Sequence, residues 1–431
     1  MPTILIKGGR IIDPASGLNK VADVLIKGRK IAAVGRVTEK ADRVIDAKGK
    51  IVAPGLIDLH VHLREPGMAE AETIASGAEA AVAGGFTSVV AMANTEPPVD
   101  NPASAEYVRL QAERAGFANV FPAGCISKGR KGEELAEMGI LAKAGCVGFS
   151  DDGNPVEKSE MMRRAMEYAR MLDRPILSHA EDKSLSAGGA MNEGVVSTSV
   201  GIFGIPAAAE VIMVERDVAL AALTGARLHV QHVSTAGAVD AVRRAKARGL
   251  AVTAEAAIHH LVLTDECLLE RDAAGILKFD THYKMNPPLR SKADVEAVRK
   301  GLADGTIDCI VSDHAPHTLE AKELEFMDAP FGIIGLETTL ALVATELVAK
   351  ELLDWPAAIA AMTVKPAKVA GLAKGTLAVG ADADVTVIDP DAEWTVDVSA
   401  FRSKARNSPF GGRKVTGKAV CVIVGGAVKI G

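Results

Sequence analysis

Residues 56–62 read Leu-Ile-Asp-Leu-His-Val-His, an apolar run that predicts a buried β-strand with two histidines at its carboxyl end. Because side chains alternate across a strand, His60 and His62 are expected on the same face. Two imidazoles on one face make half of a binding site for a divalent metal ion. The alternative is a pair of buried, hydrogen-bonded histidines, and it weakens if other metal-binding side chains join them.

The same arrangement, an apolar run with helical segments on either side, recurs along the middle of the chain. We expect eight parallel strands, at residues 56–62, 88–92, 120–126, 147–150, 175–179, 227–233, 251–256 and 308–313. Segments with helical periodicity lie between them, for example 70–83 and 159–171. This α/β alternation predicts a (β/α)8 barrel of the TIM type. The main alternative, a doubly wound open sheet, would usually have a glycine-rich phosphate loop where this chain has its two histidines.

Three later strands also end in residues that can bind a metal ion. His179 ends the run that begins at residue 175, His232 ends the run from 228, and Asp313 ends the run from 309. Because the carboxyl ends of barrel strands open onto one mouth, we expect these three side chains to meet the first two histidines there. Packing or supporting roles are expected for the other histidines of the middle region, which are His229, His259, His260, His282 and His314.

The two ends of the chain have a different pattern. Short β segments bounded by glycine and proline occupy residues 4–7, 24–27 and 31–34, and again residues 384–389 and 419–424, with a predicted hairpin turn at Gly28. Chain termini often lie close together. We therefore predict a small β-sandwich domain formed by residues 1–54 and 375–431, and a barrel formed by residues 55–374.

Composition excludes several classes of function. The 431 residues carry a net charge of −6 with no long basic run, which argues against a nucleic-acid partner. No apolar stretch approaches the ~20 residues that cross a bilayer. The five cysteines are scattered and never spaced as Cys-x-x-Cys, so neither a disulfide framework nor a thiolate metal site is expected. With no signal peptide in view, a cytoplasmic location is expected.

Several motifs together resemble the dihydroorotases of the amidohydrolase superfamily. Residues 58–67, Asp-x-His-x-His-Leu-Arg-Glu-Pro-Gly, look like the first signature of that family. Residues 312–317, Ser-Asp-His-Ala-Pro-His, followed by Lys322, look like its second signature. Segments 92–95, 149–153 and 285–290 match as well and in the same order, so the resemblance covers nearly the whole chain. Val311 departs slightly, because a smaller residue is commoner there.

The predicted fourth strand separates this chain from many related enzymes. Hydantoinases and allantoinases have there a carboxylated lysine that bridges two metal ions, whereas residues 150–153 read Ser-Asp-Asp-Gly. An aspartate can bridge in the same way, because its two oxygens can each bind one cation. The chain is therefore similar to the bacterial dihydroorotases that use aspartate. We expect Asp152 as the ligand and keep Asp151 as the alternative, since the two point to opposite faces of a strand.

The resemblance implies a metal centre and a reaction. It implies one or two zinc ions, held by His60, His62, Asp152, His179, His232 and Asp313. It also implies the reversible interconversion of N-carbamoyl-L-aspartate and (S)-dihydroorotate in pyrimidine biosynthesis. Asp313 would act as the catalytic acid–base, taking a proton from the attacking water and passing it to the leaving amide nitrogen.

Dihydroorotate carries a carboxylate, and an enzyme that binds it needs a cation nearby. Arg64 lies two residues beyond His62 at the same mouth, and its planar fork suits a carboxylate. Arg290 is the second candidate for this role. The resemblance implies further substrate contacts from Asn94, Asn286, His317, Phe331 and Gly332.

Two other functions are consistent with the same motifs. A dihydropyrimidinase or allantoinase would act on substrates of different charge, so Arg64 and the missing strand-four lysine argue against it. A non-catalytic scaffold for aspartate transcarbamoylase would have lost metal ligands, whereas every expected ligand is present. Association with aspartate transcarbamoylase and assembly into a homo-oligomer are further expectations from the resemblance.

Overall fold

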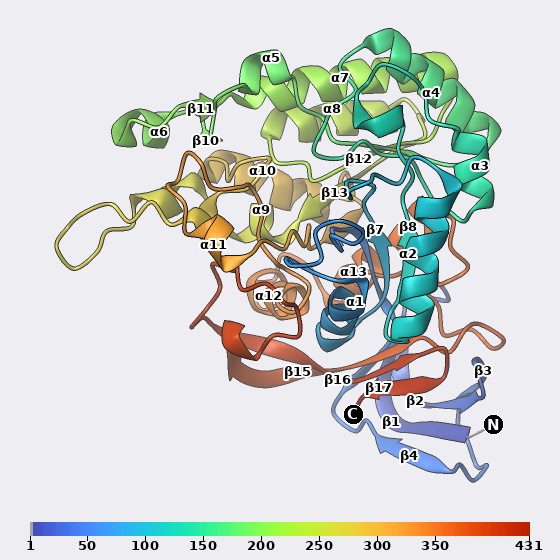
Figure 1. Cartoon of the computed structure of the whole chain (residues 1–431). Helices are drawn as coiled ribbons and strands as arrows, with labels where there is room; N and C mark the ends of the chain where they lie inside the picture. Colours follow the sequence, from blue (N-terminus) through green and yellow to red (C-terminus); the bar gives the residue numbers. More distant parts are fainter. Residues whose placement is uncertain (1–2) are drawn as a thin grey trace.

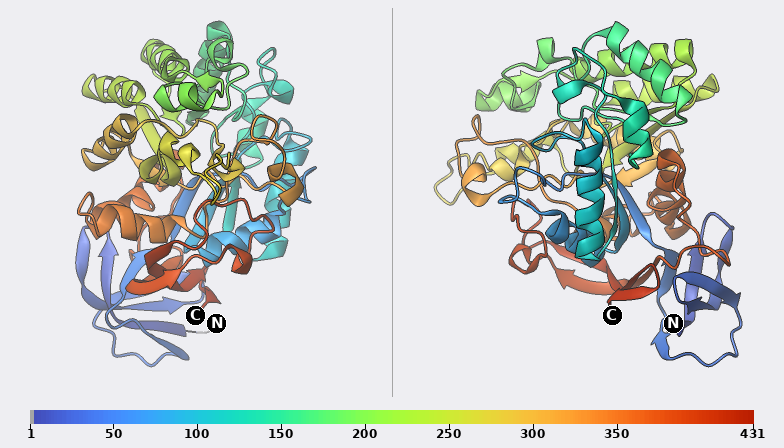
Figure 2. Two further views of the ribbon diagram at one scale, coloured as in Figure 1. Left: turned by 90° about the vertical axis from the view of Figure 1, so that its left-hand side faces the viewer. Right: turned by 45° about the vertical axis from the view of Figure 1, so that its right-hand side comes forward.

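The computed structural model describes residues 3–431 and contains a barrel with a β-sheet domain against one side of it (Figure 1). Figure 2 shows both ends of the chain in the sheet domain. Within the described residues, no helix combines the length and the apolar character needed to cross a membrane.

The barrel contains the eight predicted parallel strands. They are β6 (Leu56–Val61), β7 (Phe86–Ala91), β8 (Asn119–Pro122), the single bridging residue Phe149, β9 (Ile176–Ser178), β12 (Leu228–Val230), β13 (Val252–Ala257) and β14 (Cys309–Val311). Each pairs in parallel with the next, and a bridge between Val61 and His314 closes the ring. The TIM-type barrel is therefore confirmed, and its fourth strand is the shortest.

Helices follow the strands and surround the barrel. They are α1 (Ile74–Ala83), α2 (Pro102–Ala115), α3 (Met138–Lys143), α4 (Ser159–Met171), α7 (Ala207–Thr224), α8 (Ala236–Ala247), α10 (Lys292–Ala303), α12 (Thr339–Leu342), α13 (Trp355–Ala361) and α14 (Val364–Ala370), with a π-helical turn at Val343–Val348. The bounds of α4 are those predicted. The first helix begins at Ile74 rather than at residue 70, because the Thr73 side chain accepts a hydrogen bond from the Ser76 amide and caps it there.

Additional elements lie in the loops that follow strands. Four of them are inserted after β9, namely α5 (Lys183–Ser186), β10 (Met191–Asn192), α6 (Val195–Val200) and β11 (Gly204–Ile205). Others are α9 (Ile258–Val262), α11 (Leu319–Lys322) and the 3-10 turns Lys128–Arg130, Asp265–Leu269, Thr281–Tyr283 and Val398–Ala400. In Figure 1 the inserted elements α5, α6 and α11 gather at the left and upper left of the barrel.

The sheet domain joins the two ends of the chain. Its strands are β1 (Thr3–Asp13), β2 (Leu18–Lys27), β3 (Lys30–Gly35), β4 (Arg43–Asp46), β5 (Ile51–Pro54), β15 (Val385–Thr395), β16 (Lys414–Val424) and β17 (Ala427–Ile430). The order is β17-β16-β15-β5-β1-β2-β3, with β4 beside β1. Ile26 and Ile31 from one end of this sheet share a core with Val387 and Ile423 from the other, so the sheet folds over as a sandwich. All eight strands lie within residues 1–54 and 375–431.

Residues 396–413, between β15 and β16, leave the sheet and pack on the barrel. Val396 and Phe410 belong to the hydrophobic core of the barrel rather than to that of the sandwich. The amide of Val396 donates to the carbonyl of Arg413, which closes the base of this excursion. The strand pattern at the end of the chain did not indicate this contact with the barrel.

Candidate metal centre

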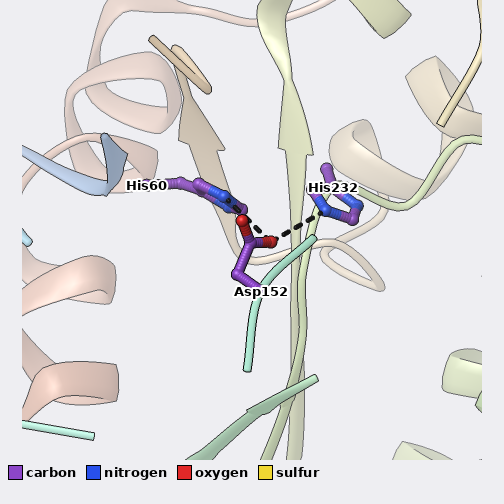
Figure 3. Close-up of side chains that lie close together, drawn as sticks. All are labelled: His60, Asp152 and His232. Carbon is purple, nitrogen blue, oxygen red and sulfur yellow. Dashed lines mark ion pairs between the residues drawn. The ribbon is translucent and has the colours of Figure 1, made fainter. Parts of the chain in front are cut away.

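Asp152 lies at the centre of four imidazoles at the carboxyl end of the barrel strands. Its Oδ1 is 3.4 Å from His60 Nε2, 3.3 Å from His179 Nδ1 and 3.5 Å from His232 Nε2. Its Oδ2 is 3.6 Å from His62 Nε2. Figure 3 shows His60 and His232 pointing toward the Asp152 carboxylate from opposite sides. The four histidines predicted at strand ends are thus brought together around one carboxylate.

Asp313 completes the group from the end of the last barrel strand. Its Oδ1 lies 3.3 Å from His62 Nε2 and 3.5 Å from His60 Nε2. The alternative ligand Asp151 points away, because its carboxylate accepts hydrogen bonds from the amides of Ile126 (2.8 Å) and Ser127 (3.1 Å). The geometry therefore favours Asp152 over Asp151.

The two buried carboxylates are held in the charged form by their neighbours. Burial alone would raise the pKa of Asp152, but the nearby imidazoles of His60, His179 and His232 bring it well below its usual value. Burial opposes ionisation of Asp313 too, and His60 and His62 lower its pKa. Both groups are anionic at neutral pH, as metal ligands must be.

Three residues of this region have an uncommon backbone conformation. The φ angles of Arg64, His232 and Asp313 are 60°, 31° and 48°. Positive φ is rare for residues with a side chain and is concentrated at functional sites, where surrounding structure enforces it. Strained backbone at the ends of β6, β12 and β14 turns these side chains toward the mouth.

The arrangement fits a divalent metal ion. His60 Nε2 and Asp152 Oδ1 are both buried and lack a hydrogen-bond partner. Within the described chain, ligand atoms close enough to share a metal ion occur in the sets His60, Asp152, His232 and His60, His62, Asp313. Imidazole nitrogens mixed with carboxylate oxygens suit a transition metal such as zinc better than calcium or magnesium.

A buried carboxylate sets the tautomer of His60. Glu255 Oε1 lies 2.7 Å from His60 Nδ1, and Glu255 Oε2 lies 3.0 Å from His229 Nε2. Burial would raise the pKa of Glu255, but His229 and His60 lower it to about 2, so the carboxylate only accepts hydrogen bonds. Nδ1 of His60 therefore carries a proton, and Nε2 is the nitrogen that can bind a metal ion once its own proton is displaced. His229, predicted only to pack, takes part in this network.

Two further ligand candidates are oriented in the same way. Asn94 Oδ1 accepts from His62 Nδ1 at 2.8 Å, which leaves His62 Nε2 free. Glu181 Oε2 accepts from His179 Nε2 at 3.1 Å, which leaves Nδ1 facing Asp152. The same Glu181 oxygen accepts from the Asn286 amide at 3.0 Å. Both asparagines predicted to contact substrate are thus linked to candidate metal ligands, Asn94 directly to His62 and Asn286 through Glu181 to His179.

A cavity of about 360 Å³ opens beside this centre. Its lining includes the remaining predicted substrate-binding residues, Arg64, His317, Phe331 and Gly332, together with both asparagines. Gly332 has a φ of 124°, and a Cβ there would lie 2.7 Å from the Ala315 side chain. Only glycine fits this close approach between the two loops that form one wall.

Arg64 supplies a buried positive charge to the cavity. Its Nε donates to the carbonyl of Pro316 at 3.0 Å. No carboxylate in the described chain lies within ion-pair distance of its guanidinium. Burial lowers its pKa to about 10, so it stays cationic at neutral pH. A guanidinium in this position is available for an anionic ligand.

The prediction of Arg290 as the second candidate for binding the substrate carboxylate is wrong. Its side chain donates to the carbonyl of Ile205 at 2.9 Å, to Asn192 Oδ1 at 3.0 Å and to Ser234 Oγ at 3.1 Å. It is 2% exposed and does not line the cavity. Arg290 is therefore a structural cross-link beneath the inserted elements after β9.

The other histidines lie outside the group of ligand candidates. His260 Nε2 donates to the carbonyl of Pro287 at 2.9 Å, and His282 Nδ1 contacts Asp280 at 2.8 Å. His314 Nε2 lies 3.3 Å from Glu72. His259 is buried beside His260, and burial brings its pKa well below the usual value. These placements agree with the predicted packing and supporting roles.

Residues 49–238 match the family model described as dihydro-orotase-like, and residues 179–429 match one described as amidohydrolase family. A curated dihydroorotase of Pelotomaculum thermopropionicum (strain DSM 13744 / JCM 10971 / SI) is 54% identical over 99% of this chain and 98% of its own length. The chain belongs to the dihydroorotase family. A second relative in this family, a dihydroorotase of Syntrophotalea carbinolica (strain DSM 2380 / NBRC 103641 / GraBd1), is 53% identical over the same shares of both chains.

Solved structures resemble this dihydroorotase-family chain over nearly their whole length. The L-hydantoinase from Arthrobacter aurescens has a TM-score of 0.87 and 29% identity, covering 100% of this chain and 96% of its own. A dihydropyrimidinase from Brevibacillus agri NCHU1002 has a TM-score of 0.82 and 26% identity, covering 99% and 95%. The predicted architecture and the resemblance to metal-dependent cyclic amidases are both confirmed.

Glu255 and Glu181 were not predicted as functional residues, although the sequence around each of them could have indicated a role. Glu255 is a carboxylate within the otherwise uncharged strand β13, where an unpaired charge would be costly. Glu181 follows His179 by two positions. A charged residue inside a predicted barrel strand, or just beyond a predicted ligand, is thus a useful indicator of a supporting role.

We expect Glu255→Gln to weaken zinc binding roughly 10- to 100-fold, the usual effect of losing a carboxylate that orients a metal-binding histidine. The side-chain amide of the glutamine is neutral, so it cannot accept charge-assisted hydrogen bonds from both His60 and His229 as the carboxylate does. Competition with a chromophoric chelator measures the affinity. Glu346→Gln, a buried carboxylate paired with Lys350 and Arg413 instead, is the matched control. Equal zinc affinities of wild type and Glu255→Gln would contradict this role.

Proposed function

We propose that this chain is a zinc-dependent dihydroorotase that interconverts N-carbamoyl-L-aspartate and (S)-dihydroorotate. The observation that carries the proposal is one cavity that joins the buried imidazoles and carboxylates to the unpaired guanidinium of Arg64. A cyclic amide with a carboxylate substituent needs both features, a centre that polarises the amide and a cation for the carboxylate. Membership of the dihydroorotase family supports the same activity.

The residues that would hold zinc divide between two positions around Asp152. We assign His60 and His62, with Asp313 beside them, to one position and His179 and His232 to the other; all four imidazoles approach the Asp152 carboxylate. Zinc bound there would act as a Lewis acid toward the ring carbonyl and a water molecule. Metal analysis of the purified chain gives the number of bound ions.

Asp313 is the group we assign to proton transfer. It faces the cavity, and its neighbours keep it anionic, so it can accept a proton from the attacking water. The same carboxyl can then deliver that proton to the leaving amide nitrogen when the ring opens. In the closing direction the two transfers run in reverse.

The polar groups that line the cavity beside the histidines would bind the substrate. Arg64 offers its guanidinium to the carboxylate, and a charge-assisted pair of this kind is stronger than a neutral hydrogen bond. Asn94 and Asn286 have their amides fixed by His62 and Glu181, and His317 completes this set of polar groups. Burial and the nearby Arg64 lower the pKa of His317 to about 3, so it binds as a neutral imidazole.

Partners remain part of the proposal. On the family resemblance, we propose aspartate transcarbamoylase as a binding partner and a homo-oligomer as the form in solution. Co-purification with aspartate transcarbamoylase would test the first, and a light-scattering mass would test the second.

Purified, zinc-loaded chain should turn over dihydroorotate and N-carbamoyl-L-aspartate, and should turn over dihydrouracil and allantoin far more slowly, because these lack the carboxylate that Arg64 would bind. Ring opening is followed by ultraviolet absorbance. Faster turnover of dihydrouracil or allantoin would favour the alternative, a dihydropyrimidinase or allantoinase. No turnover in either direction would favour a scaffold for aspartate transcarbamoylase.

The variant Asp313→Asn should keep its zinc and lose roughly 10²- to 10⁴-fold in kcat, the usual contribution of a positioned acid–base group. Metal analysis and steady-state rates measure the two quantities. Asp151→Asn is the matched control, since that carboxylate faces the loop at residues 126–127, and it should keep both zinc and most of its turnover. Loss of zinc together with activity in Asp313→Asn would make Asp313 chiefly a ligand.

The variant Arg64→Met should raise the KM for dihydroorotate roughly 10- to 100-fold, the value of a hydrogen bond to a charged partner. Zinc content should not change, because Arg64 contacts Pro316 and His317 rather than the ligand candidates. Steady-state kinetics and metal analysis measure both. An unchanged KM would remove Arg64 from carboxylate binding.

A further inference from the structure

The excursion at residues 396–413 is anchored to the barrel by two carboxylates, those of the partly buried Glu337 and the fully buried Glu72. Glu337 accepts from the amides of Arg402 at 2.9 Å and Ser403 at 3.1 Å. Glu72 accepts from the amide of Lys404 at 3.2 Å and also from the Ser403 hydroxyl. This segment belongs by sequence to the sheet domain, yet it is fixed to the loops that follow barrel strands.

Asn407 lies at the inner end of this anchored segment and is 3% exposed. Its Nδ2 donates to the carbonyl of Ala315 at 3.0 Å and to the carbonyl of Gly332 at 3.1 Å. Its Oδ1 accepts from the amide of His317 at 3.2 Å, and its backbone carbonyl accepts from the amide of Ile334 at 3.0 Å. Both donors of the amide, and its acceptor, are therefore used on backbone groups of two loops.

These two loops form one wall of the substrate cavity. Ala315, His317 and Gly332 all line it. Pro316, between the two residues that Asn407 holds, accepts the hydrogen bond of Arg64 Nε at 3.0 Å. The position of the Arg64 guanidinium thus depends on a loop that Asn407 fixes from outside the cavity.

We propose that Asn407 is a positioning residue for substrate binding. It sets the spacing between residues 315–317 and residues 331–334, and with it the placement of Arg64 and His317. The identity of the substrate in this inference rests on the proposed function, whereas the positioning of the loops does not. A small misplacement of binding groups can cost 10- to 100-fold in a kinetic constant, so roughly tenfold in KM is a fair expectation for losing this cross-link.

Two variants separate hydrogen bonding from simple packing. Asn407→Asp keeps the shape of the side chain and loses both donors, placing a carboxylate oxygen against two carbonyl oxygens. Asn407→Ala removes the whole amide. The matched control is Asn119→Ala, because Asn119 also donates to a backbone carbonyl, that of Thr87 at 2.9 Å, but at the amino end of β8.

Three measurements are made on the full-length, zinc-loaded chain. They are KM and kcat for dihydroorotate, zinc content, and amide hydrogen exchange across residues 313–334. We expect both Asn407 variants to raise KM about tenfold, to change kcat less, to keep zinc, and to exchange faster at residues 315–317 and 332–334. Asn119→Ala should leave KM and exchange in these loops as in wild type.

Three results would overturn the proposal. The first is unchanged KM and unchanged amide hydrogen exchange in Asn407→Ala. The second is wild-type behaviour of Asn407→Asp, which would leave packing as the only role of the side chain. The third is an equal rise in KM in the control variant Asn119→Ala. If the wild-type chain does not turn over dihydroorotate, the proposed function fails. Faster exchange in the two loops of the Asn407 variants would in that case still support the positioning role.

Discussion

Closure of the barrel between its first and last strands is the contact on which the rest of the molecule depends. The amide of His62 donates to the carbonyl of His314 at 2.8 Å. One carboxylate, that of Asp58, accepts from the amide of His60 at 3.0 Å and from the amide of Ser312, 254 positions away, at 2.9 Å. Without this seam Asp313 would not lie beside the first two imidazoles, and neither the metal centre nor the cavity wall would exist.

Bringing these groups together has an unfavourable electrostatic free energy. Asp152, Asp313 and Glu255 are all buried in one small region, and isolated buried anions are strongly unfavourable. Protonated imidazoles offset them in the metal-free chain, since Asp152 and Glu181 raise the pKa of His179 to about 9 against the effect of burial. A divalent cation bound there would take over that role by displacing protons, which would link metal binding to the protonation of these histidines.

The strands and most of the ligand candidates could be predicted from the sequence, because an apolar run that ends in a histidine or aspartate carries both kinds of information locally. Alternation along the strand indicated only that Asp151 and Asp152 face opposite ways, and it is the hydrogen bonds from the amides of Ile126 and Ser127 to Asp151 that favour Asp152. The hydrogen bonds that orient these residues could not be predicted in this way. Arg64 and Arg290 look alike in sequence, and only the partners of Arg290 in the inserted elements show that it is structural.

Contacts that cross between the two parts of the molecule were the least predictable. Asn407 lies in a stretch with no strand or helix pattern, and its partners at residues 315, 317 and 332 are 75 to 92 positions away. The start of α1 was misplaced for a related reason. Glu72, which was included in the predicted helix, instead contacts His314 and the 396–413 excursion. Local periodicity says nothing about such distant partners.

The pairing of β5 with β15 has a consequence for how the protein is made. Strands β1–β5 leave the ribosome before the barrel does, but β15–β17, which complete their sheet and its core, are synthesised after it. The sandwich therefore stays unfinished, with an open strand edge at β5, throughout translation of the barrel. An exposed edge of this kind can pair with other chains, so the nascent protein is most vulnerable to aggregation before its final strands emerge.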